Sequence, residues 1–573
     1  MKAVIRMGSG VGNTASGFAA HAEGLNTTAS GAAAHSEGFS TLASGDTSHA
    51  EGNTTIASGS ASHAEGYLSQ ATNDTAHAEG TSTIASGVAA HAEGYLTNAM
   101  GESSHAEGST TLAAGLEAHS EGFGTQAWGA RSHTEGFNTS TQTTAINAHA
   151  EGEGNSASGR ASHVEGGGVD PLDNPAPSFA SGASSHAEGV GTTSMGFASH
   201  AEGGTADITL AAGPSALGDF SHAEGQNTVA SGSASHAEGL ATTASGNVGA
   251  HAEGQNTTAS GTASHAEGFQ TTASGASGHA EGANTQASGS FSHAEGVGTL
   301  ANAPYAHAEG ADTTASGQAS HAEGFQTQAF APNSHAEGEA TIVLAEHTGA
   351  HIMGQNGSTR FPYSWHLANG LAVGPTFNSA VIEGLTGNIY LDGTLMSPGA
   401  ADYAEMFETS DGLTIDAGYF VTFDGASDRI RKAKAGDEYI LGVISARPAI
   451  VADSSDLRWN GMFVTDEWDR ILYHEVEVAE VRNEYGDIVR EAGTKSEPVL
   501  NPEWDGSREY VSRQDREEWV AVGIVGKLLV RDDGTCVAGG YCRPDDNGMA
   551  TAADTGYRVM KRTGERQIRI FVK

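Results

Sequence analysis

One four-residue pattern, His-x-Glu-Gly, occurs twenty-two times and constrains the fold more than any other feature of the chain. Nine copies from His21 to His133 follow one another at intervals of fourteen residues, and seventeen of all twenty-one intervals have this length. Ten copies continue into x-x-T-x-A-S-G, so these units contain two glycines. A catalytic motif is needed once, whereas a motif at a fixed period indicates a repeat architecture.

A unit of fourteen residues is too short for a pair of helices, but it fits one coil of a β-solenoid with two short strands and glycine corners. His and Glu lie two apart and therefore share one face of their strand, while the Ala between them faces the other way. The inward residues are then mostly Ala, Ser and Thr. At about 25 cal/mol per Å² of buried apolar surface, such a coil gains little against its conformational entropy. We therefore expect an all-β rod that becomes stable as a homotrimer.

The repeats resemble the left-handed parallel β-roll in the heads of trimeric autotransporter adhesins, whose units also have about fourteen residues with small side chains and glycine corners. The likeness covers residues 13–354, where GAHIMGQNG is similar to a degenerate closing coil. It implies a left-handed β-roll. The signal peptide and membrane barrel of those adhesins have no counterpart in this sequence, so we do not expect export by their route.

The His-x-Glu pairs suggest two hypotheses. Rings of three His and three Glu around a trimer axis would offer the ligands that divalent cations take. Alternatively, each His hydrogen-bonds its Glu or a corner carbonyl and stacks on the next coil. Stacking requires the pair in every coil, whereas a functional metal site needs it once or twice. We therefore expect a structural ladder, with no metal site and no cofactor.

Charge and composition exclude several partners. The formal net charge is −42, and residues 1–401 hold 36 acidic side chains against five Lys or Arg. Such a surface repels nucleic acid and anionic lipid. The N-terminal segment 1–12 lacks the apolar stretch of a secretory signal, and no run of about eighteen apolar residues is present. We expect no nucleic acid partner, no membrane insertion and synthesis in a cytoplasm, where Cys536 and Cys542 form a reduced structural pair.

Three segments interrupt the repeat: residues 134–148, 166–180 and 203–218. Insertions in a solenoid leave the rod as surface loops. They are the candidates for receptor contact, although an insertion without a role is an equal alternative.

The character of the sequence changes after residue 354. Residues 355–401 bring aromatic and β-branched residues with NG, TG and DG turn signals, which predict a β-rich connector of short strands. Residues 402–573 have the mixed composition of a globular domain, and we expect a smaller α+β domain there. DRIRKAKAGDEYILGVISARPAIV and EWVAVGIVGKLLVRDDG predict strands within it.

The boundary between these parts carries the string SPGAADYAEMFE, residues 397–408. With GNIYLDG before it and GVISARP after it, this string resembles the autocleaving intramolecular-chaperone domain at the C-terminus of phage tail appendages and fibres, a glutamic peptidase family. The likeness covers residues 360–573. It implies a domain that helps a fibre to trimerise and then cuts itself off. Matched residue by residue, it implies a scissile bond between Ala401 and Asp402, with Asp402 and Glu405 as catalytic carboxylates.

The chemistry is compatible with that assignment. Amide hydrolysis near neutral pH needs one group to activate water and another to protonate the leaving nitrogen, and two close carboxylates can divide these tasks. Because Ala401 has no hydroxyl group, cleavage through an N-to-O acyl shift is excluded. Two mechanisms remain open. Water can attack with the help of the carboxylates, with Glu405 as base and Asp402 as partner or the reverse. Alternatively, Asp402 attacks its own backbone. Whether cleavage occurs in cis or in trans is also open.

Taken together, the sequence predicts a homotrimeric phage tail fibre, spike or appendage in the virion, assembled in the host bacterial cytoplasm with other tail proteins. Its expected partner is a host-surface receptor, a glycan. Peptidase activity would then be a single intramolecular turnover. One alternative is a glycan-depolymerising spike, which needs a carboxylate pair or triad in a unique groove. The other is a bacterial surface adhesin, which the missing export signal disfavours.

Overall fold

The computed structural model describes residues 7–371, 377–396, 399–459, 461–482, 488–490 and 492–573. The chain divides into two compact units, Met1–Asp392 and Gly393–Lys573. Residues 1–6 of the expected N-terminal segment, and residues 372–376 and 397–398 of the expected connector, lie outside the described part. Within that part, no helix has the length and apolar character needed to span a membrane.

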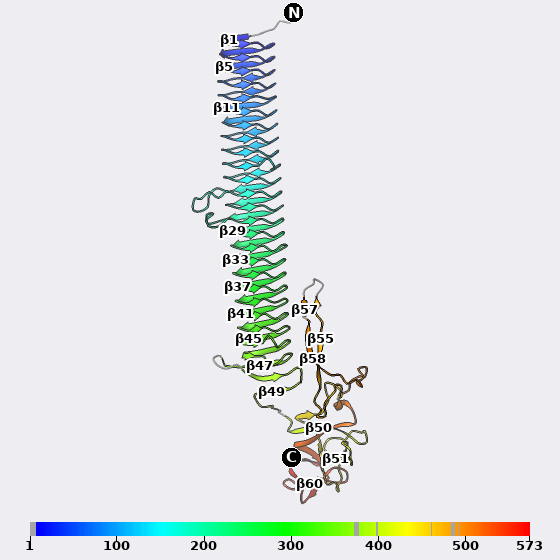
Figure 1. Ribbon diagram of the computed structural model, residues 1–573. Helices are drawn as coiled ribbons and strands as arrows, with labels where there is room; N and C mark the ends of the chain where they lie inside the picture. The colour runs from blue at the N-terminus through cyan, green and yellow to red at the C-terminus, as the bar shows by residue number, and fades with distance from the viewer. Residues whose placement is uncertain (1–6, 372–376, 397–398, 460, 483–487, 491) are drawn as a thin grey trace. The chain divides into compact units, whose positions relative to one another are not determined.

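The first unit is a parallel β-solenoid (Figure 1). A coil contains a strand that starts at the motif histidine and a two-residue strand, such as β3 (His21–Leu25) and β4 (Thr28–Ala29). Like residues pair between coils: β3 lies parallel to β5 (His35–Phe39), with His21 opposite His35. The in-register ladder satisfies the backbone of each coil through its two neighbours. The predicted β-solenoid of fourteen-residue coils is confirmed.

The interior of the coil is lined by alanine. Ala22 of the H-x-E-G strand and Ala29 of the two-residue strand are both 0% exposed, and the same positions are buried along the rod. Hydroxyl groups fill the remaining inward positions, as where Ser36 Oγ and Thr41 Oγ1 lie 2.8 Å apart. The core is therefore thin, and the backbone ladder supplies much of its order.

The two glycines of a unit serve different purposes. Gly38 has a φ of 108°, a conformation that residues with a side chain rarely adopt. Gly45 lacks that strain, but a Cβ atom there would lie 1.8 Å from the carbonyl oxygen of Gly59 in the next coil. Two further corners reach positive φ without glycine, at Ala33 and Ser40, both with φ of 54°.

Parallel pairing extends beyond the motif copies at both ends. β1 (Met7–Val11) pairs with β3, and β45 (His335–Val343), β46 (His351–Ser358) and β47 (Trp365–Asn369) continue the stack. The rings of Trp365 and His351 contact each other with centroids 4.3 Å apart, tilted by 47°. The antiparallel strands β48 (Asn378–Ile382) and β49 (Ile389–Leu391) follow β47 and close this unit.

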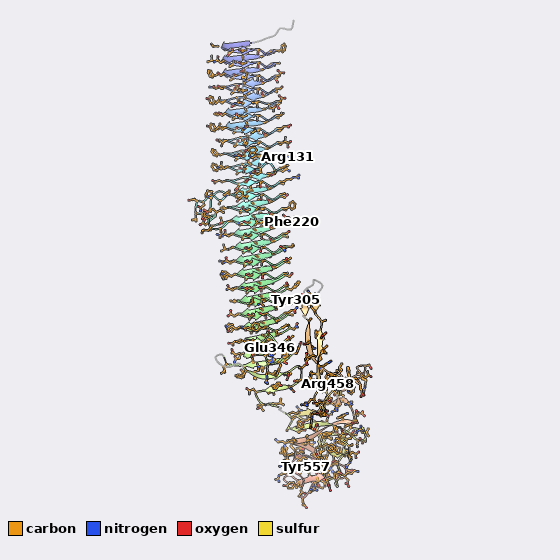
Figure 2. All side chains as sticks on the ribbon, in the orientation of Figure 1. Arg131, Phe220, Tyr305, Glu346, Arg458 and Tyr557 are labelled. Carbon is orange, nitrogen blue, oxygen red and sulfur yellow. The ribbon has the colours of Figure 1, made fainter. Side chains whose placement is uncertain are left out.

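The two longer insertions leave the rod as loops without interrupting the ladder (Figure 1). His163 still stacks on His186 at 4.8 Å across residues 166–180. The loops contact each other, because the backbone N–H of Ile208 donates to Asp170 Oδ2 at 2.9 Å. Hydrogen bonds from Asn174 and from backbone N–H groups overcome the effect of burial and lower the pKa of Asp170 to about 2. Phe220, which follows the second insertion, stands on the outside of the rod (Figure 2).

The second unit is built on one ten-stranded sheet. Its path runs β52, β51, β53, β59, β63, β62, β60, β61, and β50 pairs with both β59 and β54. The strand bounds are β50 (Asp402–Glu408), β51 (Phe420–Phe423), β52 (Ile430–Lys432), β53 (Gly442–Ile444), β54 (Ile450–Ala452), β59 (Trp519–Arg531), β60 (Tyr541–Pro544), β61 (Ala550–Ala553), β62 (Tyr557–Gly564) and β63 (Gln567–Val572). Two hairpins stand apart from it: β55 (Tyr473–Val478) with β58 (Gly493–Pro498), and β56 (Val481–Arg482) with β57 (Ile488–Arg490).

The helical part of the expected α+β domain is almost missing. Within the described residues of this unit the only helix is the three-residue 3-10 turn η1 (Arg513–Asp515). The strands predicted in 428–451 and 518–534 are present, and their apolar residues supply part of the core, with Val443, Leu528 and Val530 nearly or fully buried. Short apolar runs separated by turns form strands that pair into a sheet, and this sheet needs no covering helix.

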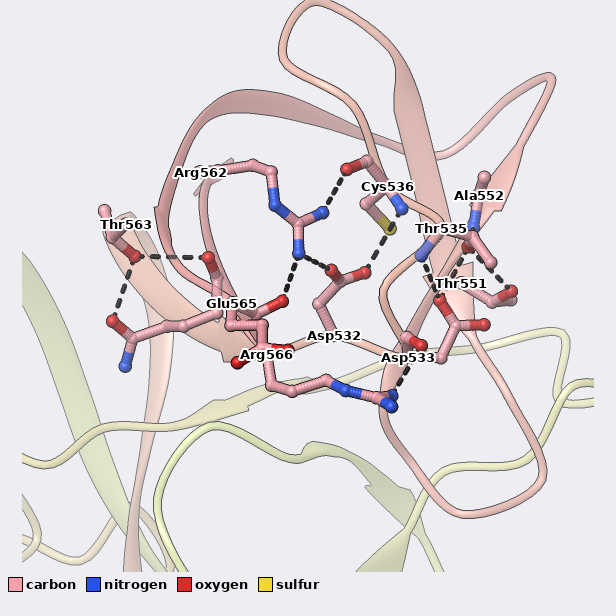
Figure 3. Close-up of polar contacts among 11 residues, drawn as sticks. Asp532, Asp533, Thr535, Cys536, Thr551, Ala552, Arg562, Thr563, Glu565 and Arg566 are labelled. Atoms are coloured by element: carbon pink, nitrogen blue, oxygen red, sulfur yellow. Dashed lines mark hydrogen bonds and ion pairs between the residues drawn. The ribbon is translucent and has the colours of Figure 1, made fainter.

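A buried polar cluster fixes the end of the central strand β59 (Figure 3). Asp532 directly follows β59, and its fully buried carboxylate lies 2.7 Å from Nη2 of Arg562 on β62. The backbone N–H of Cys536 donates to the same carboxylate at 3.3 Å. Cys536 and Cys542 are buried and free, as expected, and burial raises the pKa of Cys542 to about 12. The cluster thus ties β59 to its neighbours.

Candidate functional site: the start of strand β50 and the His–Glu ladder

The motif histidines form one continuous stack along the rod. His35 and His49 lie 4.7 Å apart with their rings 6° from parallel, and the same arrangement recurs from His21 to His351. His186 Nε2 lies 3.2 Å from Glu165, a hydrogen-bond distance, whereas the other His–Glu contacts of the ladder lie at 3.4 to 4.0 Å. Stacking of the rings, rather than a His–Glu hydrogen bond, is therefore the regular contact between coils.

The glutamates form a second ladder beside the histidines. Glu37 shares hydrogen bonds with Glu51 and Glu23, which together with burial raise the pKa of Glu37 to about 7. Its neighbour Glu51 has a lowered pKa, because it accepts hydrogen bonds from Glu65 and Glu37. Adjacent carboxyl groups thus share protons, and the alternation continues to Glu165.

The ladder also gathers metal-ligand atoms. Those of His91, Glu93 and His105 lie within 4.8 Å of one another, and many such groups repeat along the rod. The ring stacking repeats along the whole rod, whereas the alternation of glutamate pKa values runs from Glu37 to Glu165.

The predicted scissile bond lies where the chain enters the sheet of the second unit. Asp402 is the first residue of β50, which lies between β54 and β59, and it is only 7% exposed. The carbonyl oxygen of Ala401 accepts a hydrogen bond from the backbone N–H of Lys527 at 3.3 Å. The carbonyl oxygen of Asp402 accepts another from the N–H of Ala449 at 2.8 Å. Hydrogen bonds to the carbonyl oxygens of both residues thus hold the peptide bond between Ala401 and Asp402 in place.

The structure does not bring the two predicted carboxylates to one face. Asp402 and Glu405 are three positions apart on a single strand, so their side chains leave opposite faces of the sheet. The burial pattern agrees, since Asp402, Ala404 and Met406 are buried while the alternate positions are more exposed. Of the two predicted catalytic carboxylates, only Asp402 therefore lies beside the predicted scissile bond.

The carboxylate of Asp402 is in an unusual environment. Its Oδ2 atom is buried and has no hydrogen-bond partner among the described residues. A Cβ atom at Gly523 would lie 3.1 Å from this oxygen, so glycine makes room for it. A buried carboxylate without a donor is costly, and such groups are typical of functional sites.

A hollow beside the bond is rich in positive charge. Ala401 and Asp402 line it, and Glu405 is absent from its described lining. The cationic side chains that line it are Arg447, Lys527, Arg531, Arg566 and Arg569. A positive field at this place favours negative charge developing on the carbonyl oxygen of Ala401.

Sequence analysis missed Lys527 and Arg447, which lie far from Asp402 in the chain. The available signal was the pair of glycines Gly523 and Gly526 within an otherwise apolar strand. Isolated glycine inside a strand indicates a bulge or a close backbone approach. Both occur here: the pairing shifts between Tyr403 and Ala404, and a Cβ at Gly526 would lie 2.3 Å from the Ala401 oxygen.

Comparison with known families matches one model to the C-terminal part of the chain. Residues 353–567 match the family model described as Peptidase_G2, IMC autoproteolytic cleavage domain. This part of the chain is therefore similar to an autoproteolytic cleavage domain. The matched segment includes β50, β59 and the bond between Ala401 and Asp402.

Relatives that share part of this chain come from phages and from a bacterium. The pre-neck appendage protein of Bacillus phage B103 is 36% identical over 156 residues, which are 27% of this chain and 16% of that protein. The preneck appendage protein of Bacillus phage PZA is 34% identical over 172 residues, 29% and 18% of the two chains. The phage-related protein YobO of Bacillus subtilis strain 168 is 36% identical over 186 residues, 32% and 21%. The chain spans about a fifth of the length of these relatives.

Two solved structures of bacteriophage phi29 gene product 12 are also similar. Its C-terminal fragment is 32% identical and aligns over 30% of this chain and all of that one, with a TM-score of 0.24. Its pre-mature form is 14% identical and aligns over 97% of this chain and 69% of that one, with a TM-score of 0.33.

Proposed function

We propose that the protein is a homotrimeric tail appendage of a phage that binds a host-surface glycan, and that its C-terminal domain drives trimerisation and then cleaves itself off between Ala401 and Asp402. The observation that carries this proposal is the Peptidase_G2 domain next to a long solenoid, with the string ADYAEMFE at the start of β50. The names of the phage relatives support placement in the virion among other tail proteins, after synthesis in the host cytoplasm.

Trimerisation is supported by apolar side chains on the outside of the rod. The residue that follows each H-x-E-G motif is often aromatic, and Phe39, Tyr67, Tyr95 and Phe123 are 45 to 52% exposed. They share one position in the coil and therefore one face of the rod. Copies packed along this face would bury a second surface, which the thin alanine core needs.

The opposite orientations of Asp402 and Glu405 support cleavage in trans. In this proposal Asp402 acts beside its own bond, and Glu405 of a neighbouring copy supplies the second carboxylate. Water adds to the carbonyl carbon of Ala401 as one carboxylate takes its proton, and the other carboxyl group, in its protonated form, gives a proton to the nitrogen of Asp402 as the C–N bond breaks. The domain would then cut only after chains have assembled.

Intact mass of the purified chain tests the cleavage. We expect fragments 1–401 and 402–573 from the natural chain and an uncut Glu405→Gln chain. Glu408→Gln is a matched control, since it alters another carboxylate of the same strand and should leave cleavage unchanged. A folded natural chain that stays whole would contradict the proposed cleavage.

Co-expression distinguishes trans from cis. An Asp402→Asn chain keeps Glu405, and a Glu405→Gln chain keeps Asp402 at its own bond. In mixed assemblies the Glu405→Gln chain should be cut, although each variant alone stays whole. Absence of this complementation, in assemblies shown by native mass spectrometry to contain both chains, would favour cleavage in cis.

A further inference from the structure

We propose that the backbone N–H of Lys527 is the donor that stabilises the oxyanion at Ala401 during self-cleavage, and that Gly526 is the positioning residue that lets it approach. The proposal rests on cleavage between Ala401 and Asp402. Its first observation is the hydrogen bond from Lys527 N–H to the Ala401 carbonyl oxygen, 3.3 Å long. This oxygen is the atom on which negative charge develops when the carbonyl carbon is attacked.

The second observation is the backbone of Gly526. Its φ is 127°, and a Cβ atom there would lie 2.3 Å from the Ala401 oxygen and 2.6 Å from Asp402 Cα. Any residue with a side chain would therefore displace the scissile bond from β59. Glycine at this buried position brings the next N–H, that of Lys527, to the carbonyl.

A bulge in β59 explains why the approach occurs here. Tyr403 pairs with Val525 and Ala404 pairs with Gly523, so Ile524 is an extra residue in β59. Bulges bend a strand and redirect its groups, and they are common beside active sites. The regular ladder resumes from Glu405 opposite Val522. The irregular pairing is thus confined to the neighbourhood of the scissile bond.

The chemistry needs one water molecule and no other reagent. Water adds to the carbonyl carbon of Ala401 and loses a proton to a carboxylate, and the C=O electron pair moves onto the oxygen. The Lys527 N–H shortens its hydrogen bond to this oxyanion, while the side chains of Lys527 and Arg447 line the same hollow. When the C=O bond re-forms, the C–N bond breaks and the nitrogen of Asp402 leaves with a proton. Donors of this kind accelerate such steps about 100- to 1,000-fold.

Replacing one backbone amide by an ester tests the donor directly. Incorporation of the α-hydroxy analogue of lysine at position 527 of the full chain removes the N–H and keeps the side chain. We expect the rate of appearance of fragments 1–401 and 402–573, followed by intact mass, to fall about 100-fold. The matched control is the α-hydroxy analogue of leucine at Leu529, which lies on β59 opposite Arg569, two residues beyond Lys527. Lys527→Gln, which keeps the N–H, is expected to cleave far faster than the ester.

Gly526→Ala is a second test of the positioning role, with Gly425→Ala as its control. Both glycines have positive φ, but nothing lies within 4 Å of a Cβ built at Gly425. We expect Gly526→Ala to slow cleavage and Gly425→Ala to leave its rate unchanged. The melting temperatures of both variants should show that they are folded.

The outcomes separate the two proposals. If the natural chain is folded and stays whole, the proposed cleavage itself fails. If the natural chain is cut and the ester at position 527 is cut at the same rate, the assignment of Lys527 is overturned. Equal loss of rate with the ester at Leu529 would overturn it as well, because the effect would then come from general weakening of β59.

Discussion

Gly38 illustrates how much a single position in the coil is constrained. It combines a φ of 108° with a backbone approach that would place a Cβ 2.1 Å from the carbonyl oxygen of Gly52. The same geometry recurs in the other motif copies, as at Gly52 and Gly80. The regular spacing of the motif therefore depends on backbone geometry as well as on side-chain packing.

Gly38→Ala should lower the stability of the rod by about 1 to 3 kcal/mol, the typical cost of a residue held in a sparsely populated backbone conformation. The melting temperature of the full chain, followed by calorimetry, measures the effect. Ser40→Ala is the control, because Ser40 already has a side chain at a positive φ of 54°. Equal melting temperatures for Gly38→Ala and the natural chain would show that the coil relaxes around the added methyl group.

At the scale of an element, β50 shows what could be predicted and what was missed. The string around Asp402 and Glu405 indicated the right family, but the segment was not assigned to a strand. In a strand, an odd spacing sends two side chains to opposite faces, so the pair cannot meet within one chain. Lys527 and Gly526 come from β59, and only the sheet topology brings them to Ala401. Spacing along the sequence carries no information about such pairings.

The rod was easier to predict for a physical reason. Each coil contacts only its two neighbours, so the local period determines the stacking partner of every residue. The fixed period also predicts the corners of the coil. It does not predict Trp365, where the parallel pairing of strands continues after the last copy of the motif. Trp365 takes the position of the motif histidine with its ring tilted by 47°, which a search for the motif does not detect.

The glutamate ladder makes the stability of the rod depend on pH. Glu37 and its alternate partners have pKa values of about 7, above the value of about 4.3 in an unfolded chain, so the folded state favours their protonated form. This contribution is complete below the unfolded pKa and is lost as the pH rises through about 7. Burial lowers the pKa of His77, so the neutral ring favours folding above about pH 6.5, and this contribution is lost at lower pH.

We therefore expect the melting temperature to fall as the pH rises from about 6 to about 8. Glutamine mimics the protonated acid, so a variant with five such replacements should lose this dependence: Glu37, Glu65, Glu93, Glu121 and Glu151. Glu102→Gln with Glu117→Gln is the control, since both side chains are exposed and outside the ladder. An unchanged pH profile in the fivefold variant would refute proton sharing.

At the scale of the whole molecule, the rod behaves as a series of nearly equal units. Stability in a solenoid is approximately a sum over units and their interfaces. Removing a whole unit therefore joins two like coils, whereas removing half a unit puts the H-x-E-G strand opposite the wrong partner.

Deletion of residues 252–265, one unit of fourteen, should leave the melting temperature nearly unchanged and cleavage at Ala401 intact. Deletion of residues 252–258 should lower the melting temperature, because the following H-x-E-G strands would stack on two-residue strands and the histidine stack would be interrupted there. Calorimetry and intact mass measure both effects. Comparable destabilisation by the two deletions would contradict the additive behaviour of the coils.

The in-register stack has a consequence for how such a gene changes over generations. Recombination between two copies of the repeat inserts or removes whole coils, and each product keeps its histidine stack and its alanine interior. Natural variants of this protein should then differ in length by multiples of one repeat, while the cleavage domain keeps a constant size. A single genetic event could thereby change the length of the rod without passing through a misfolded intermediate.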